Sequence, residues 1–232
     1  MSAGSLEGRV VAIPGAGGSL GPHVARALGK AGATLAVTDI SAELLEPLDA
    51  ADRRVVDLLD ADATAAWARV LEERLGHVDA VVHLVGGWRG GKPLAEAPLE
   101  DWAFLSDLLV RTVQHTSRAF HDALNRSGRG RFVLMSAKQA VDPTDRNAAY
   151  AAAKAAAEAW VYALADGFAS NDSGATANVV AINALVTPEM RAAEPDRAFK
   201  TFTDATDIAE AIRFLLSDAG AKMNGQRLAL YG

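Results

Sequence analysis

Two side chains that could transfer a proton stand four residues apart, at Tyr150 and Lys154. A spacing of four places both on one face of a helix. A phenol has a reference pKa of about 10 and is a weak base, but a nearby ammonium stabilises the phenolate and lowers that pKa. We therefore predict that Tyr150 exchanges a proton with a substrate oxygen, assisted by Lys154. The alternative is that the pair marks only an exposed helix face.

A second stretch has the pattern of a phosphate-binding turn. The apolar run 9–14 is followed by Gly15-Ala16-Gly17-Gly18-Ser19-Leu20-Gly21 and then by a helical segment with Pro22 in its first turn. Glycine lets the backbone approach a ligand closely, and the N–H groups that open a helix attract an anion such as a pyrophosphate. The next apolar run ends at Asp39, where a carboxylate that binds ribose hydroxyls is expected. The predicted dinucleotide site contains Gly15, Ser19, Leu20, Gly21 and Asp39; a plain tight turn is the alternative.

The choice of cofactor follows from charge. Asp39 would accept a hydrogen bond from the 2′-hydroxyl of NAD and would repel the 2′-phosphate of NADP. Ala16 and Ile40 occupy places where a phosphate-binding arginine would otherwise stand. We therefore predict NAD, with a hydride moving to or from its nicotinamide while Tyr150 handles the proton. Lys154 is also expected to hold the nicotinamide ribose.

The composition excludes several other classes of protein. The formal net charge is −6 and no basic cluster stands out, so nucleic acid and anionic membranes are not expected partners. Cysteine is absent, which excludes disulfides, thiolate catalysis and cysteine metal sites, and we predict no metal site. Residues 1–7 lack a signal pattern, and no run approaches the ~20 apolar residues of a membrane span. We expect a cytoplasmic protein that acts on a small molecule.

Apolar runs alternate with helical patterns along all 232 residues. This predicts one domain, 1–232, with a Rossmann-type, doubly wound α/β fold: a seven-stranded parallel sheet with helices on both faces. We expect strands at 9–14, 33–39, 53–57, 79–85, 131–136, 176–182 and 226–230. We expect helices at 19–31, 41–49, 62–76, 99–126, 147–170, 189–199 and 206–217. Ligands of such sheets bind beyond the carboxyl ends of the strands, where Asp39, Gly86, Ser136 and Thr187 all fall.

The end of the third strand has two interpretations. Asp57 and the backbone of Leu58 are predicted to meet the adenine of the cofactor. Alternatively, this acidic stretch only starts the next helix, with Asp60 or Asp62 as its cap.

The fourth strand ends in Val85 and Gly86, and glycine there permits a turn close to the cofactor. We interpret His83, within that strand, as a hydrogen-bonded core histidine, with proton transfer as the alternative. The loop from Trp88 to Pro98 either lines the mouth of the substrate site or faces solvent.

In these motifs the sequence resembles the short-chain dehydrogenase/reductase (SDR) family, over nearly the whole chain. The segment 15–21 matches the family's glycine-rich turn, with Ser19 in place of its middle glycine. Asp57 matches an aspartate of its third strand, and Tyr150 with Lys154 matches its Tyr-x-x-x-Lys element.

The C-terminal part supports the same resemblance. Residues 207–218 resemble the family's late helix, and residues 224–226 resemble the turn into its last strand. Thr187 matches a threonine that contacts the cofactor, and 188–203 corresponds to a short substrate loop. The resemblance implies an NAD(P)-dependent oxidoreductase that acts on an alcohol or carbonyl compound. It also implies a homodimer or homotetramer that pairs through the helices 99–126 and 147–170.

Two catalytic positions depart from the family's pattern. The usual serine falls on Ala137 and the usual asparagine falls on Leu109. Ser136 is adjacent, but neighbouring side chains of a strand point to opposite faces. Losing a donor to the substrate oxygen can cost roughly 10²–10³ in rate, and the candidate replacements are Lys138, Gln139 and Thr144.

The departures leave three functions open. The first is hydride transfer between the nicotinamide and a small alcohol or carbonyl substrate. The second is a homologue that binds NAD but has lost hydride transfer, and that has a sensing or structural role. The third is another NAD-assisted reaction, such as dehydration or epimerisation.

Overall fold

Apolar runs form the central strands of a parallel sheet, and these strands are buried along their whole length. In the computed structural model, which describes residues 5–231, seven strands pair in the order β3-β2-β1-β4-β5-β6-β9, and every pair is parallel. The predicted fold class is confirmed. The strands are β1 (Val10–Pro14), β2 (Thr34–Asp39), β3 (Asp52–Val55), β4 (Ala80–His83), β5 (Arg131–Ala137), β6 (Thr176–Ile182) and β9 (Arg227–Ala229).

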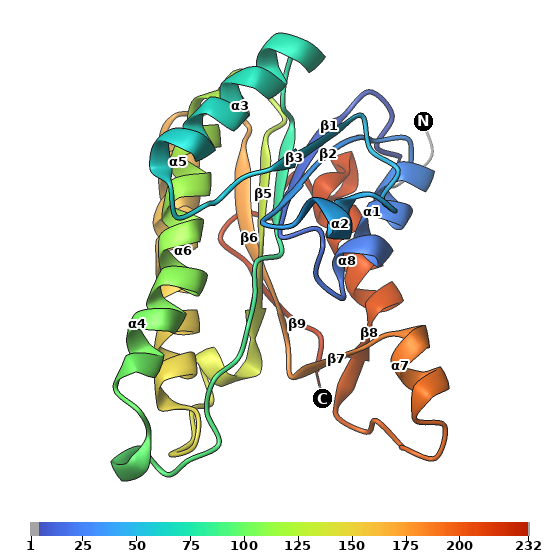
Figure 1. Ribbon diagram of the computed structural model, residues 1–232. Coiled ribbons are helices and arrows are strands. Elements are labelled where there is room, and N and C mark those ends of the chain that lie inside the picture. Colours follow the sequence, from blue (N-terminus) through green and yellow to red (C-terminus); the bar gives the residue numbers. More distant parts are fainter. Residues whose placement is uncertain (1–4, 232) are drawn as a thin grey trace.

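Helices cover both faces of the sheet (Figure 1). One layer contains α3 (Ala61–Leu75), α5 (Thr112–Arg126) and α6 (Ala148–Ser170), and the other contains α1 (Gly21–Lys30) and α8 (Ala205–Leu216). Each layer buries its own apolar core against the sheet. In the first core, the rings of Trp67 and Phe120 meet edge to face at 5.1 Å between centroids. The shorter elements are α2 (Ala42–Leu45), α4 (Glu100–Ser106), α7 (Pro188–Ala193) and the small parallel sheet of β7 (Ala184–Val186) with β8 (Phe202–Asp204).

The predicted helix 99–126 is not one regular α-helix. A π-helix, Asp107–Arg111, separates α4 from α5. Directly after it, the hydroxyl of Thr112 donates to the carbonyl oxygen of Leu108 at 2.7 Å. A side chain that bonds a carbonyl in this way competes with the regular helical ladder. Such π-helical turns are frequent at functional sites.

Several other predicted bounds are also wrong, each for a local reason. The helix predicted at 41–49 ends at Leu45, two residues before Pro47, which cannot continue a helix. The helix predicted at 189–199 ends at Ala193, and Phe199 has a φ of 44°, a left-handed conformation that an α-helix cannot contain. The third strand ends at Val55 rather than at residue 57. The pair β7 and β8 was not predicted, because three-residue strands carry too little pattern.

Residues 1–4 and Gly232 of the predicted domain lie outside the described residues, and so does much of the N-terminal stretch in which a signal pattern was sought. In the part of the chain that the structure describes, no helix is both long and apolar enough to cross a membrane.

Candidate active site

The glycine-rich turn is packed so tightly that two of its glycines cannot be replaced. Gly15 has a φ of 76°, and a Cβ built on it would lie 2.7 Å from the backbone nitrogen of Val85. A Cβ on Gly21 would lie 1.9 Å from the carbonyl oxygen of Ala16. Both distances are shorter than van der Waals contact. The turn after β1 therefore lies against the chain that leaves β4, and Val85 is brought next to the predicted cofactor site.

The first turn of α1 can accept an anion. The residue at its N-cap, Leu20, provides no side-chain cap, and Pro22 follows within the first turn. Ser19 is exposed in the adjoining turn. Backbone N–H groups at such an uncapped helix start bind phosphate groups, and the glycines leave room for close approach. These features fit the pyrophosphate of a dinucleotide.

The carboxylate of Asp39 lies directly beside this turn. Its Oδ2 accepts a hydrogen bond from the N–H of Gly17 at 3.0 Å, and its Oδ1 accepts one from the N–H of Ile40 at 2.8 Å. Asp39 therefore lies directly beside the predicted phosphate site, and its contact with a ribose stays a prediction. The side chain of Ile40 is 77% exposed and Ala16 is buried. Because both side chains are apolar, neither adds a positive charge at this position.

The end of the third strand is organised by two aspartates. Asp57 is exposed, and its Oδ1 accepts a hydrogen bond from the N–H of Leu59 at 2.9 Å, which turns the chain. Asp60 caps α3 by accepting from two backbone N–H groups. Leu58 is buried, and its carbonyl oxygen accepts from His115 Nδ1 at 2.8 Å. The adenine contact of Asp57 and Leu58 stays a prediction, whereas the capping role is found at Asp60.

Tyr150 and Lys154 lie one turn apart near the start of α6, but their surroundings differ from those we expected. Tyr150 packs against an apolar cluster that includes Leu105, Leu109 and Ala153. Burial raises the pKa of Tyr150 to about 12. The expectation that Lys154 lowers the pKa of Tyr150 is wrong in this structure, because burial in the cluster around Leu109 dominates.

The ammonium of Lys154 bonds to the sheet. It is buried, and its Nζ donates to the carbonyl oxygen of Met135 at 2.9 Å. Burial lowers the pKa of Lys154 to about 8, against the opposing attraction of the Glu158 carboxylate. At neutral pH the residue is therefore mainly charged.

The structure shows where the two positions that differ from the family's catalytic pattern, Leu109 and Ala137, lie. Leu109 lies within the π-helix, so this irregularity occurs at the position where the asparagine is missing. Ser136 cannot replace the missing serine, because its hydroxyl donates to Oε1 of Glu158 at 2.6 Å in a buried position. Ala137 ends β5.

Of the three candidate replacements for that serine, Gln139 is the one whose side chain links two strand ends. Its Nε2 donates to Oδ1 of Asn183, just after β6, at 3.2 Å. Lys138 pairs instead with Asp142 at 3.1 Å. Thr144 is exposed.

His83 is fully buried at the end of β4, and its Nε2 lies 3.3 Å from the hydroxyl of Thr112. Burial, with a smaller repulsion from Lys154, lowers the pKa of His83 to about 3. This agrees with its interpretation as a hydrogen-bonded core histidine.

The loop that contains Trp88 contacts the segment before α6. The N–H of Gly91 donates to the carbonyl oxygen of Arg146 at 2.7 Å, and Arg146 Nη1 donates back to the carbonyl oxygen of Gly91 at 2.9 Å. Gly86 and Trp88 are exposed. The loop is therefore attached to the chain that leads into Tyr150, and its role at a substrate mouth stays a prediction.

The predicted substrate segment 188–203 begins at a helix cap. Thr187 is buried, and its hydroxyl accepts from the N–H of Met190 at 3.2 Å. The two arginines of the segment form local ion pairs: Arg191 with Asp204 at 3.1 Å, and Arg197 with Glu194 at 3.0 Å.

The sequence analysis missed a buried carboxylate beside Lys154. Glu158 is 4% exposed and forms an ion pair with Arg227 at 2.9 Å. A signal was present, because Glu158 is one of two acids in an alanine-rich helix, the other being Asp166, and it stands four residues after Lys154. Its partner on β9 could not be found in that way.

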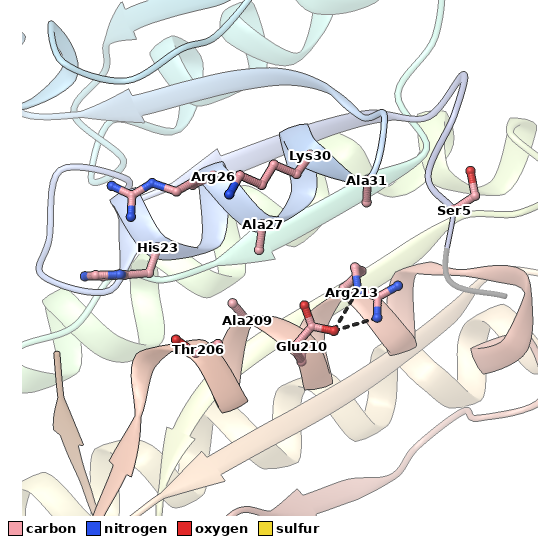
Figure 2. Close-up of a pocket in the computed structure, with 10 residues that line it drawn as sticks. All are labelled: Ser5, His23, Arg26, Ala27, Lys30, Ala31, Thr206, Ala209, Glu210 and Arg213. Carbon is pink, nitrogen blue, oxygen red and sulfur yellow. Dashed lines mark hydrogen bonds and ion pairs between the residues drawn. The ribbon is translucent and has the colours of Figure 1, made fainter. Parts of the chain in front are cut away.

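A surface groove of about 620 Å³ lies between α1 and α8 (Figure 2). Arg26 and Lys30 line it from α1, and Glu210 and Arg213 line it from α8. Arg213 forms an ion pair with Glu210 at 2.5 Å. The groove contains none of the residues predicted for the active site.

Comparisons with known proteins extend over almost the whole chain. A family model described as enoyl-(acyl carrier protein) reductase matches residues 15–232. Dehydrogenase/reductase SDR family member 6 of Danio rerio is 26% identical over 247 residues, which cover 99% of this chain and 98% of the relative. This chain belongs to the short-chain dehydrogenase/reductase family.

Further SDR proteins agree with this assignment. The 7alpha-hydroxysteroid dehydrogenase of Escherichia coli is 25% identical over 244 residues, covering 98% of this chain and 94% of the relative. A gluconate 5-dehydrogenase from Burkholderia cenocepacia, solved in complex with NADP and tartrate, superposes with a TM-score of 0.85 at 26% identity, covering 99% and 96% of the two chains. The relatives are named dehydrogenases or reductases, and this chain is an oxidoreductase of the same family.

Proposed function

We propose that this SDR protein transfers a hydride between a nicotinamide cofactor and a small alcohol or carbonyl substrate. The observation that carries the proposal is the placement of two groups at the same edge of the sheet. The uncapped start of α1, the tight turn at Gly21 and Asp39 suit a dinucleotide. Tyr150 and Lys154 stand at the start of α6, which follows the carboxyl end of β5.

The environment of Tyr150 favours the reducing direction. With its pKa raised to about 12 by burial, Tyr150 is a protonated phenol at neutral pH and serves as an acid. NAD(P)H, when bound, supplies the hydride to the carbonyl carbon. Tyr150 donates its proton to the carbonyl oxygen, which becomes the hydroxyl of the product alcohol. Lys154 binds the ribose beside the nicotinamide and keeps a positive charge near the reacting oxygen.

NAD is the proposed cofactor rather than NADP. The carboxylate of Asp39 is held in place by the N–H groups of Gly17 and Ile40. A 2′-phosphate at this position would meet that negative charge. The Burkholderia relative was solved with NADP and a xylitol dehydrogenase of similar structure was solved with bound NAD+, so the proposal rests on the charge of Asp39 and not on the relatives.

The substitution Tyr150→Phe tests the proposal. We expect kcat to fall by about 10²–10⁴-fold, the usual contribution of a positioned proton donor. NADH absorbance is followed while ketones, aldehydes and alcohols are screened, and NADH binding is titrated by its fluorescence. The variant should bind NADH as the wild type does. An unchanged turnover would rule out the role of Tyr150.

A second function is favoured by the two positions, Leu109 and Ala137, that differ from the family's catalytic pattern. Leu109 is part of the apolar cluster against which Tyr150 packs, and the hydroxyl of Ser136 donates to Glu158. Both features suit a homologue that binds NAD but has a sensing or structural role. NADH binding without turnover of any screened substrate would select this alternative.

We also propose that the chain forms a homodimer or homotetramer through α5 and α6. Along α6 the exposed positions Ala152, Ala156, Ala159 and Ala163 form a face of small side chains. A groove of about 420 Å³ beside it is lined by Trp160 and Leu164. Small side chains let two helices approach closely. Light scattering on the wild type and on Ala159→Glu tests this proposal, because the charge should produce monomers. The cytoplasmic location stays a prediction.

A further inference from the structure

At the carboxyl end of β5, three successive residues each form a hydrogen bond with a charged side chain. Lys154 Nζ donates to the carbonyl oxygen of Met135 at 2.9 Å. The next residue, Ser136, donates its hydroxyl to Oε1 of Glu158 at 2.6 Å. Lys154 and Glu158 are one turn apart on α6, so one helix contacts two neighbouring residues of the strand through two opposite charges.

The third residue, Ala137, is held from the other side. Arg227 on β9 donates its Nη2 to the carbonyl oxygen of Ala137 at 3.0 Å. Its Nε donates to Oε2 of Glu158 at 2.9 Å. Its Nη1 donates to the hydroxyl of Tyr231 at 2.6 Å. The same guanidinium therefore links α6, the end of β5 and the C-terminal segment.

The carboxylate of Glu158 is almost removed from water. It is 4% exposed, and in addition to Ser136 and Arg227 it accepts a hydrogen bond from the hydroxyl of Tyr162 at 3.2 Å. A buried charge is tolerated only where partners of this kind surround it. Because replacing a buried ion pair by neutral side chains is often no less stable, stability alone does not account for a charge at this place.

We propose that Glu158, anchored by Arg227, is a positioning residue of the active site. Its negative charge keeps Lys154 in the charged form, and its bond to Ser136 fixes the end of β5 beside the catalytic helix. This inference rests on the proposed function, in which a charged Lys154 binds the nicotinamide ribose and assists Tyr150.

The other groups around Lys154 do not provide a compensating negative charge. From β4 it faces His83, which is neutral because its pKa lies at about 3. Tyr150, one turn earlier on α6, is a protonated phenol and carries no negative charge. β5 contributes a carbonyl oxygen. Asp107 and Arg111 of the neighbouring π-helix pair with each other at 3.2 Å. Among the described residues, Glu158 is thus the acid that acts on Lys154, and Arg227 offsets part of its charge.

The test is the pH dependence of the reactivity of Lys154 in the full, cofactor-free chain. Trace acetylation with acetic anhydride modifies only the neutral amine, and peptide mass spectrometry gives the labelling midpoint for each lysine. In the wild type we expect the midpoint of Lys154 near pH 8. In Glu158→Gln, which keeps the size of the side chain but replaces one accepting oxygen by a donating NH2 group, we expect the midpoint to fall by about one pH unit.

Two control variants separate charge from structure. Tyr162→Phe removes a donor to the same carboxylate but leaves the charge, and its midpoint should equal that of the wild type. Glu158→Asp keeps the charge on a shorter side chain; it should lose stability in urea but retain a midpoint close to pH 8. If Glu158→Gln does not fold, the double variant Glu158→Gln/Arg227→Gln replaces the ion pair by neutral side chains, and its midpoint should also fall.

Two outcomes overturn the proposal. One is a midpoint that stays near pH 8 in Glu158→Gln or, where that variant does not fold, in the double variant. The other is an equal shift in Glu158→Asp and Glu158→Gln, which would show a structural effect without a role for charge. NADH titrations at pH 6–9 on the same variants form a separate arm. A shifted labelling midpoint in a chain that binds no NADH would support the role of Glu158 and contradict the proposed function instead.

Discussion

The two halves of the proposed site are built by different means. In the cofactor half, backbone makes the site: the turn at Gly15 and Gly21 lies against other backbone atoms, and the start of α1 presents N–H groups. In the catalytic half, side chains make the site, since Tyr150 depends on an apolar cluster and Lys154 on a buried carboxylate. In the first half, Gly15 and Gly21 leave no room for a side chain, whereas the second half can be tuned by single substitutions.

The largest effect is expected at Gly21. In Gly21→Ala the new Cβ would lie 1.9 Å from a backbone oxygen, so the turn must move. We expect a loss of about 3 kcal/mol in the free energy of unfolding and no measurable NADH binding. Urea unfolding and fluorescence titration measure the two quantities.

A matched control for stability lies in the same turn. At Gly18 the nearest atom to a new Cβ would be 3.5 Å away, an ordinary contact. Gly18→Ala should therefore change the unfolding free energy by less than about 0.5 kcal/mol. Equal stability losses in the two variants would contradict the role given to close packing at Gly21.

The next effect concerns the charge in the cofactor half. Asp39→Ser removes the carboxylate that faces the ribose, so the ratio of the Kd values for NADP and NAD should fall by at least about tenfold, or about 1.4 kcal/mol. Asp57→Asn, at an exposed carboxylate that turns the chain, should leave this ratio unchanged. Calorimetric titration of both cofactors gives the ratio. If wild-type chain binds NADP more tightly than NAD, the assignment of Asp39 is wrong.

The smallest effect is expected in the catalytic half, at Leu109. Leu109→Asn brings a polar group into the cluster that raises the pKa of Tyr150 to about 12. Because the cause of that raised pKa is burial, the pKa should fall by about one unit toward its reference value of about 10. The phenolate would then form at lower pH. Leu109→Met keeps the cluster apolar and should leave the pKa unchanged.

Ultraviolet titration of the phenolate measures this difference. The chain has only three tyrosines, so Tyr150→Phe assigns the signal. A Tyr150 pKa that is the same in Leu109→Asn and Leu109→Met would show that the apolar cluster does not control the acid.

This difference between the halves also explains what could be predicted from the sequence. The order of strands and helices and the glycine turn follow from local patterns, because glycine and apolar runs mark their own positions. The environment of Tyr150 could not be predicted in the same way. Its pKa depends on contact with Leu109, about 40 residues earlier in the chain, and sequence spacing alone gives no distance between them.

The ion pair of Glu158 and Arg227 is a second example. The two residues are far apart in sequence and meet because β9 lies beside β6 in the sheet and α6 packs on β5 and β6. The π-helix at Asp107–Arg111 was missed for a related reason, since an apolar pattern does not distinguish it from a regular α-helix. Asp57, by contrast, was assigned to the strand because its turn-forming bond to Leu59 is not visible in the hydrophobic pattern.

The most direct test of the account is a crystal structure of the chain with saturating NADH. We expect the pyrophosphate at the start of α1 beside Ser19 and Leu20, the adenosine ribose on Asp39, and the nicotinamide beside Tyr150 and Lys154. NADH bound in the groove between α1 and α8, or only solvent beside the glycine-rich turn, would contradict the account.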